Sequence, residues 1–426
     1  MVNMMKYQKP TGTMDFFPED MELRKKVFDS LRNTAERFGF KEVESPAFES
    51  IELLTKKSGE EITNQIFVLE QKGEGKDKKE RFGLRFDLTV PFTRMFVEKQ
   101  KELAKPVKWF GISRMWRYER PQQGRLREFY QLSVEVFGSD KPEADAEIIN
   151  LAVECLKDLG LSEKDFYVRL NNRKLLQGIL EQLSDSKDKK VIDSLISLVD
   201  KKEKIGEEEF SKALEEIGVK EIEKLKKILA VNDIKEFETI ELNKTAQDGL
   251  EELKNIIKLI DSKFVKLDLT TARGLAYYTG TVFELFDKSG KYRALAGGGR
   301  YDNMVELFNG EPCPATGFAI GYATLSLLLK EKGLAPKPDT GVEYYVIAIG
   351  DDVVKEKALN LVMKLRKKYS ADWDIMGRSL AKQMSYANTI NAKNVIIIGD
   401  EELKTGKIKI KDMKTGKEKT VNMEEF

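Results

Sequence analysis

The sequence predicts an α+β protein in which an antiparallel-sheet domain is interrupted by a helical insertion and followed by a small α/β domain. Two long strand patterns, 107–120 and 126–138, surround a tight turn and predict an antiparallel hairpin. Residues 171–261 are rich in Lys and Glu and poor in Gly and Pro, which indicates helices. Residues 342–426 alternate strand and helix patterns, as a separate α/β domain does.

These patterns predict a division into domains. The chain of 426 residues is long enough for two or three domains with their own cores. We predict that residues 1–170 begin the sheet domain, that residues 171–261 form the insertion, and that residues 262–334 complete the sheet domain. The composition of "KEKGLAPKPDTG" marks a linker, after which residues 340–426 form the last domain. The net charge is only +1, so any surface for nucleic acid has to be local.

Several classes of protein are excluded by composition. The chain has no histidine, the usual acid or base near neutral pH, which excludes Ser-His-Asp and Cys-His catalysis and every His-based metal site. Cys155 and Cys313 are isolated, so neither a zinc site nor a disulfide framework is predicted. The N-terminus lacks a signal-peptide core, and no apolar run approaches the ~20 residues of a membrane span. We therefore expect a cytoplasmic protein without membrane contacts.

The first elements are a helix and a hairpin. Residues 19–38 place apolar side chains at helical spacing after Pro18. "FVLEQ" and "RFGLRFD" flank the charged loop "KGEGKDKKE" and predict a hairpin with an exposed tip. "LRFDLTVP" then places Asp87 and Thr89 on one face of an extended segment, before a helix over 92–103. Such a pair suits an ammonium group, but it is also common on an ordinary edge strand.

The hairpin around "RMWRYERPQQGRLREF", residues 114–129, carries five arginines. Arginine is suited to bidentate contacts with phosphate, so this turn is the best candidate for an anionic ligand. On the second strand Phe129, Gln131 and Glu135 share one face, where the aromatic ring can stack on a flat base. The alternative is a solvated hairpin whose arginines pair with nearby glutamates.

Two later stretches are further site candidates. "TARGLAYYTGT" places Arg273 and the phenols of Tyr277 and Tyr278 at a strand–loop junction, although core tyrosines give the same pattern. "GGGRYDN" permits close approach of the backbone to a ligand, and a plain turn into a helix explains it as well. We expect 294–308 and 315–329 to be glycine-rich entries into apolar helices. The sequence contains neither a P-loop nor a Rossmann fingerprint.

Five stretches in order resemble the histidyl-tRNA synthetases, a class II aminoacyl-tRNA synthetase family, and together they cover nearly the whole chain. "FGFKEVESPAFES" resembles the dimer-forming motif 1, and "RYERPQQGRLREF" resembles motif 2. "LDLTTARGLAYYTGTVFE" and "GGGRYDN" are similar to the two peptides that distinguish this family within class II. "GRSLAKQMSYANTINAKNVIIIG" resembles its anticodon-binding domain. The resemblance implies a class II antiparallel-sheet catalytic domain, a homodimer, and histidine–tRNA ligase activity with ATP, Mg²⁺, L-histidine and tRNA(His).

The resemblance also implies a histidine-binding set. Its members that would hold the amino end of histidine are Asp87, Thr89 and Gln131. Glu135 and Tyr278 would face the imidazole ring, with Tyr277 beside it. A carboxylate and a phenol can satisfy the N–H and the lone pair of a neutral imidazole.

For ATP, the resemblance implies contacts from the arginine-rich hairpin. Arg117 would be catalytic at the α-phosphate, with Arg273 opposite it. Arg125 would meet the outer phosphates, Glu119 the adenine edge and Phe129 its face. Cations would stabilise the charge that builds on the phosphate oxygens, and the attacking carboxylate is already an anion that needs no general base, which agrees with a chain that lacks histidine.

One position departs from the family pattern. Motif 3 of class II synthetases ends in an arginine over ATP, and "GFAIGYATL" has Thr324 there. The alternative function is therefore a non-catalytic histidine-binding paralogue, of the type of the ATP phosphoribosyltransferase regulatory subunit. That regulator typically lacks the C-terminal domain present here. Within that domain, residues 353–383 carry eight Lys/Arg and three Asp/Glu, which suits contact with tRNA or an ordinary solvated helix.

Overall fold

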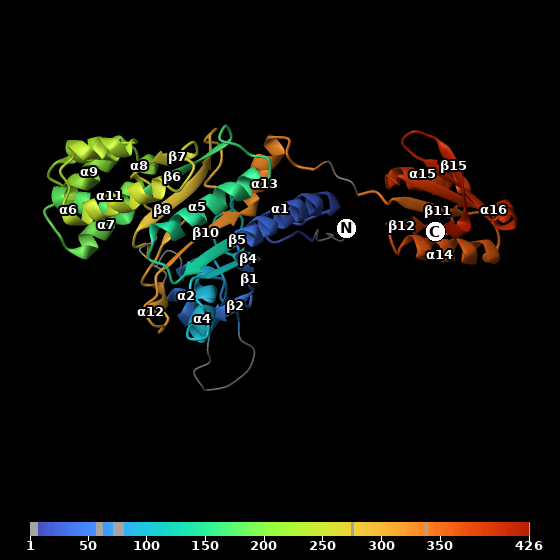
Figure 1. Cartoon of the computed structure of the whole chain (residues 1–426), viewed down its shortest axis with the longest axis horizontal. Helices are drawn as coiled ribbons and strands as arrows, with labels where there is room; N and C mark the ends of the chain where they lie inside the picture. The colour runs from blue at the N-terminus through green and yellow to red at the C-terminus, as the bar shows by residue number, and fades with distance from the viewer. Residues whose placement is uncertain (1–6, 57–62, 71–80, 274–276, 337–339, 426) are drawn as a thin grey trace, which may run out of the picture. The chain divides into compact units, whose positions relative to one another are not determined.

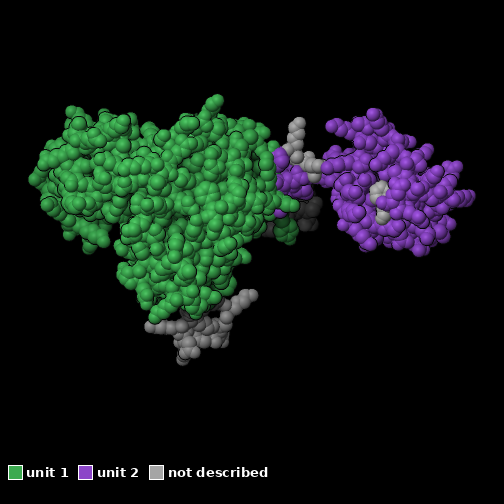
Figure 2. Space-filling view, viewed as in Figure 1, with its two compact units in different colours: residues 1–15, 23–335 green, residues 16–22, 336–426 purple. Residues whose placement is uncertain are grey.

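The computed structural model describes residues 7–56, 63–70, 81–273, 277–336 and 340–425. Its internal contacts divide the chain into two compact units, which Figure 2 colours separately. The larger unit contains residues 1–15 and 23–335, and the smaller unit contains residues 16–22 and 336–426. The tip of the first predicted hairpin, 71–80, and the segment 274–276 after Arg273 lie outside the described residues. Among the helices described, none is long and apolar enough to cross a membrane.

The larger unit is built on an eight-stranded sheet with the order β1-β4-β5-β10-β9-β8-β6-β7 (Figure 1). The six central strands pair antiparallel, and the short outer strands β1 and β7 join in parallel. The predicted α+β class is therefore correct. The strands are β1 (Lys41–Glu42), β4 (Val107–Trp116), β5 (Glu128–Phe137), β6 (Phe166–Asn172), β7 (Val265–Leu267), β8 (Thr281–Asp287), β9 (Ala296–Arg300) and β10 (Ala315–Gly321).

The arginine-rich hairpin is formed by β4 and β5, which are shorter than predicted. Their ladder ends where Trp116 opposes Glu128, and residues 117–127 form the turn. Pro121 has no N–H to donate to a ladder, and Gly124 has a φ of +75°, which only glycine adopts easily. The tip of this connection is a tight turn, in which Gln122 and Arg125 exchange backbone hydrogen bonds of 3.0 and 2.9 Å.

Helix α5 (Pro142–Lys157) covers one face of β9 and β10. Its buried Asp145 accepts hydrogen bonds from Arg300 Nε at 2.9 Å and from Thr316 Oγ1 at 2.8 Å. Arg300 and Thr316 oppose each other across the two strands, so this network ties the helix to both. Because side chains alternate along a strand, the network also decides which face of β9 and β10 is left for a ligand.

The stretch "GGGR" is a strand and not the predicted turn into a helix. Its glycines, 297–299, lie in β9 inside the sheet, and the following α12 (Met304–Leu307) is a single turn. Likewise "ATGFAIG" forms β10 before α13 (Tyr322–Glu331). Glycine weakens a strand on average, so the sequence did not predict strands here. In β9, however, atoms from distant parts of the chain occupy the positions that side chains at 297–299 would need.

The predicted extended segment at Asp87 and Thr89 is also different. Strand β3 (Phe82–Leu84) ends earlier, and helix α4 (Thr89–Lys99) begins at Thr89 instead of residue 92. Asp87 Oδ1 accepts the Val90 N–H at 3.4 Å, and a side-chain oxygen at this point favours a helix start. The sequence pattern placed the start after Pro91, but a proline is tolerated in the first turn of a helix, and Pro91 lies in the first turn of α4.

The other elements at the start of the larger unit lie outside the main sheet. Strand β3 pairs with β2 (Phe48–Ser50), and α2 (Ile51–Thr55) follows β2. The predicted first helix is α1 (Pro18–Arg37), whose apolar stripe is buried from Leu23 onward.

The Lys/Glu-rich segment between β6 and β7 is helical, in agreement with its composition. Figure 1 shows these helices gathered beside β6, β7 and β8. They are α6 (Arg173–Leu183), α7 (Lys189–Asp200), α8 (Lys202–Ile205), α9 (Glu207–Ile217), α10 (Ile222–Leu229), a 3₁₀ turn (Ile234–Thr239) and α11 (Lys244–Ile257).

The smaller unit holds a five-stranded sheet with the order β12-β11-β13-β14-β15. One apolar core lies between this sheet and α14, and a second involves α15. Strands β11, β12 and β13 are parallel, and β14 and β15 add an antiparallel hairpin. The elements are β11 (Tyr344–Ala348), α14 (Asp352–Leu365), β12 (Ala371–Trp373), α15 (Leu380–Thr389), β13 (Asn394–Ile398), α16 (Asp400–Thr405), β14 (Lys407–Asp412) and β15 (Glu418–Asn422).

Candidate active site

A cleft of about 730 Å³ lies in the larger unit between the β4–β5 hairpin, strands β8 to β10 and the α7–α8 corner of the helical segment. Six of the eleven predicted site residues line it, and all of them come from the two segments singled out in the sequence. They are Arg117, Glu119, Arg125, Phe129, Gln131 and Arg273. The structure thus brings together side chains that are up to 156 positions apart in the sequence.

The turn of the hairpin is held by its own contacts. Arg117 donates from its backbone N–H to the Arg127 carbonyl at 2.9 Å, and its Nε donates to the Phe86 carbonyl at 3.1 Å. Its guanidinium lies 5.2 Å from the centre of the Phe129 ring. Arg125 forms an ion pair with Glu119. Cation and ring thus share one wall of the cleft, as required for a ligand with a phosphate and a base.

The electrostatics of the cleft favour an anion. Burial lowers the pKa of Arg117, and the nearby cations of Arg273 and Arg293 lower it further, against the opposing charge of Asp87. Burial also lowers the pKa of Arg273, but the neighbouring Tyr278 and Glu284 outweigh burial, and the net shift is upward. Because guanidinium groups remain charged at any accessible pH, the crowding is relieved by a bound anion and not by loss of a proton.

Arg273 is placed over the glycines of β9. A side chain at Gly297 would collide with its guanidinium group, and one at Gly299 would lie 3.0 Å from the Tyr278 ring. Arg273 also has a left-handed φ of 44°, which is uncommon for a residue with a side chain. The glycines therefore supply the floor on which the arginine and the phenol lie.

Several buried polar atoms at the cleft have no hydrogen-bond partner among the described residues. Arg273 Nη1 lies 3.7 Å from Glu284 Oε1, yet neither its Nε nor its Nη1 has a hydrogen-bond acceptor there. Gln131 Oε1 and Thr271 Oγ1 likewise lack a donor within the described part of the chain. Buried polar groups normally have partners, so these four atoms indicate a polar ligand.

The other five predicted residues do not line the cleft. Tyr277 and Tyr278 have hydroxyl oxygens 3.4 Å apart, and their rings are 4.5 Å apart. Burial raises the pKa of Tyr277, and the charges of Asp87 and Glu135 raise it further. Glu135 itself is buried beside Gly317. Asp87, Glu135 and the tyrosines therefore form a neighbouring set, while Thr89 lies two positions from Asp87 at the start of α4.

Thr324, at the position of the missing arginine, lies in the first turn of α13 and lines the cleft. Its hydroxyl donates to the Gly124 carbonyl at 3.3 Å. The residue therefore contacts the tip of the hairpin turn, which no feature of the sequence indicated.

The cleft also contains residues that the sequence reading missed. Glu284, Thr271 and Arg293 line it, and so do residues 197–204 of the helical segment. Strand alternation places Glu284 and Phe286 on one face of β8, but nothing in the sequence places residues 197–204 here. An ion pair connects this part of the helical segment to the sheet, because Arg169 Nη1 of β6 lies 2.9 Å from Glu203 Oε1.

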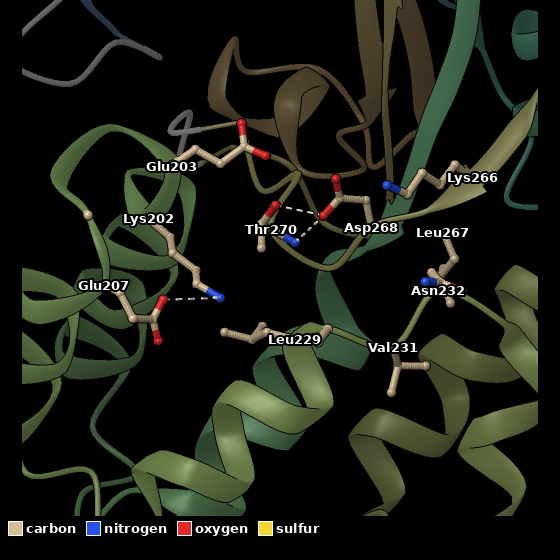
Figure 3. Close-up of a pocket in the computed structure, with 12 residues that line it drawn as sticks. Lys202, Glu203, Glu207, Leu229, Val231, Asn232, Lys266, Leu267, Asp268 and Thr270 are labelled. Carbon is tan, nitrogen blue, oxygen red and sulfur yellow. Dashed lines mark hydrogen bonds and ion pairs between the residues drawn. The ribbon is translucent and has the colours of Figure 1, made fainter. Parts of the chain in front are cut away.

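A second pocket of about 370 Å³ adjoins this cleft and shares Glu203 and Thr270 with it (Figure 3). Three of its charged side chains have partners in the pocket. Lys202 pairs with Glu207 at 3.9 Å, and Asp268 accepts from Thr270 N–H at 3.0 Å and Oγ1–H at 2.6 Å. The described atoms of this pocket therefore give no sign of a ligand.

The β14–β15 hairpin of the smaller unit is rich in lysine. Within the described residues, seven lysines on or beside this hairpin form no ion pair: Lys404, Lys407, Lys409, Lys411, Lys414, Lys417 and Lys419. In the predicted basic segment 353–383, Lys355, Arg366 and Arg378 pair with aspartates, and five lysines form no ion pair within the described residues: Lys357, Lys364, Lys367, Lys368 and Lys382. The sequence reading missed the hairpin because its lysines alternate with core isoleucines.

Comparisons with known proteins agree with this architecture. Residues 12–325 match a family model described as histidyl-tRNA synthetase, and residues 343–426 match one described as anticodon binding domain. The histidine–tRNA ligase of Haloarcula marismortui is 39% identical over 99% of this chain and 97% of that protein. Histidyl-tRNA synthetase from Nostoc sp. PCC 7120 superposes with a TM-score of 0.80 and 27% identity over 99% of both chains. A Bacillus halodurans structure described as an ATP phosphoribosyltransferase regulatory subunit/histidyl-tRNA synthetase has a TM-score of 0.75 and 25% identity, and the match covers 92% of this chain and 98% of that one.

Proposed function

The chain belongs to the histidyl-tRNA synthetase family, and from this premise we propose that it activates L-histidine with ATP and transfers it to the 3′ end of tRNA(His). The observation that carries the proposal is the meeting of Arg117, Arg125 and Arg273 in one cleft with Phe129. Three arginines can bind the phosphates of a nucleoside triphosphate, and an aromatic ring can stack on its base. The reaction would take place in the cytoplasm, where translation uses charged tRNA.

Histidine is held next to this cleft. Gln131, Asp87 and Thr89 bind its ammonium group, and Glu135 and Tyr278 face its ring, with Tyr277 beside them. Support comes from the burial of Glu135 and from the charges of Asp87 and Glu135, which raise the pKa of the neighbouring Tyr277 in addition to its burial. A buried carboxylate requires a hydrogen-bonding partner, so amino acids without a ring N–H are rejected.

The activation step is an in-line displacement. The histidine carboxylate attacks the α-phosphorus of ATP, the bond to the bridging oxygen breaks, and pyrophosphate leaves with that electron pair. Arg117 and Arg273 stabilise the charge that develops on the α-phosphate oxygens. Arg125 binds the outer phosphates, while Glu119 and Phe129 bind adenine. The carboxylate is already an anion, so this step needs no general base.

Mg²⁺ would enter with the nucleotide and offset the charge of its phosphates. Glu284 lines the cleft and has the carboxylate oxygens that this ion prefers. Groups of three or more Asp, Glu or Cys that could hold a metal alone do not occur among the described residues. The phosphates would therefore supply most of the ligands.

We assign the parts of the chain as follows. Residues 1–170 and 262–334 form the catalytic domain, residues 171–261 the insertion, and residues 340–426 the domain that binds the anticodon arm of tRNA. A homodimer forms through the motif 1 segment around Pro46, whose backbone is fixed by the buried Arg85. Sedimentation of the purified protein tests the dimer.

The deciding experiment is histidine-dependent exchange between ATP and pyrophosphate. We expect the wild-type protein to catalyse it, and Arg273→Ala to lose most of the activity while keeping its thermal unfolding midpoint. Lys355→Ala, which alters an exposed pair in the smaller unit, serves as the control. Binding of histidine without exchange would instead support the regulatory paralogue. In that case Thr324→Arg tests whether the missing arginine is the cause.

A further inference from the structure

We propose that the N-terminal segment 10–13, called the strap below, positions the nucleotide-binding turn of the β4–β5 hairpin through Arg127. The inference rests on the proposed function, because it concerns the contacts of Glu119 and Arg125 with ATP. Arg127 does not line the cleft, so its role would be positioning and not contact with the nucleotide.

The strap is hydrogen-bonded to the start of β5. The Gly12 carbonyl accepts the N–H groups of Arg127 at 2.7 Å and Glu128 at 3.3 Å. Thr13 closes the strap on itself, because its N–H and its hydroxyl both donate to the Pro10 carbonyl, at 3.1 and 2.7 Å. A closed turn holds the Gly12 carbonyl in a fixed direction toward β5.

Gly12 is also confined by its neighbours. Its φ is +83°, and a β-carbon at this position would lie 2.8 Å from Arg127 Cγ and 2.9 Å from Pro121 Cγ. These two atoms belong to the two sides of the hairpin turn. Even one methyl group on the strap would therefore displace the turn or move the strap away from it.

Arg127 carries the contact onward to the nucleotide-binding residues. Its Nε donates to the Glu119 carbonyl at 3.0 Å, and its guanidinium lies 4.3 Å from the centre of the Tyr118 ring. Its own carbonyl accepts the N–H of Arg117 at 2.9 Å. One residue thus fixes the backbone on both sides of Tyr118. The position of the strap thereby sets that of the Glu119 carboxylate and of its partner Arg125.

The test uses two glycines with similar backbones. Gly12→Ala is compared with Gly290→Ala, because Gly290 has a φ of +67° but no atom within 4 Å of an added β-carbon. Both variants place alanine in a strained left-handed backbone conformation, but only Gly12→Ala disturbs the hairpin. We expect Gly12→Ala to raise the KM for ATP in pyrophosphate exchange by about tenfold and to leave the KM for histidine within about twofold. Gly290→Ala should change neither.

A second variant covers the case in which Gly12→Ala does not fold. Arg127→Met keeps an apolar stem against Tyr118 and removes the donor to Glu119, so it should raise the KM for ATP in the same way. Calorimetric titration with ATP measures the Kd directly, so the strap is tested even if wild-type protein binds ATP without exchange and the proposed function fails. The inference is overturned if both variants bind ATP like the wild type and only their unfolding midpoints fall.

Discussion

The guanidinium group of Arg273 lies over the α-carbon of Gly297, where any side chain would collide with it. The absence of a side chain at Gly297 therefore allows this arginine its position. The relationship explains why a glycine-rich stretch can run through the interior of a sheet, and it leads to the first prediction.

We expect Gly297→Ala to reduce the rate of pyrophosphate exchange by about 10²-fold or more, because it displaces a group that stabilises the transition state. A double-mutant cycle supplies the control: once Arg273→Ala has removed the guanidinium, Gly297→Ala should cost little more. Additive losses in the two variants would mean that Gly297 acts on something other than Arg273.

Glu135→Gln tests the recognition of the histidine ring. The carboxylate is buried, and an amide offers the ring a weaker acceptor in the same space. We expect the KM for histidine to rise by about 10²-fold and the KM for ATP to stay the same. Glu331→Gln, which changes an exposed carboxylate paired with Lys291, is the matched control. Equal effects on both substrates would contradict the assignment.

Asp145→Ala should destabilise the larger unit without removing a substrate contact. It leaves the buried Arg300 without its main partner, which we expect to cost about 3–5 kcal/mol in the free energy of unfolding. Glu154→Ala on the same helix breaks the more exposed pair with Lys157 and should cost less than about 1 kcal/mol. Unfolding in urea measures both, and similar costs would show that the buried network does not hold α5 to the sheet.

The lysine-rich β14–β15 hairpin should contribute to the affinity for tRNA. We expect Lys407→Ala and Lys409→Ala each to weaken binding and to lower the slope of log K against log salt by about 1, as for loss of one phosphate contact. Lys355→Ala in the same domain should leave the slope unchanged, because Lys355 pairs with Asp352. Unchanged slopes in the hairpin variants would place the tRNA surface elsewhere, with residues 353–383 as the next candidate.

The chemistry-bearing residues could be found in the sequence because their motifs are local. The arginine-rich hairpin, "TARGLAYY" and "GGGRYDN" each combine residue types that suit one ligand, and the helical insertion and the α/β domain follow from composition and periodicity. Arg117, Gln131 and Arg273 do lie in one cleft. Their roles toward histidine and ATP remain predictions until the exchange experiment is done.

The tertiary structure alone decided how these stretches meet. The sequence suggests a turn at the glycines of 297–299, and only their distant neighbours show why glycine is needed in this strand: Arg273 at Gly297, Phe318 at Gly298, and Thr281 with Tyr278 at Gly299. Neither the approach of residues 197–204 to the cleft nor the contact of Gly12 with Arg127 leaves a local pattern. Local composition and spacing determine which elements form and which chemistry they carry. Contacts between residues distant in the chain determine where that chemistry is placed, because they depend on packing that no single segment encodes.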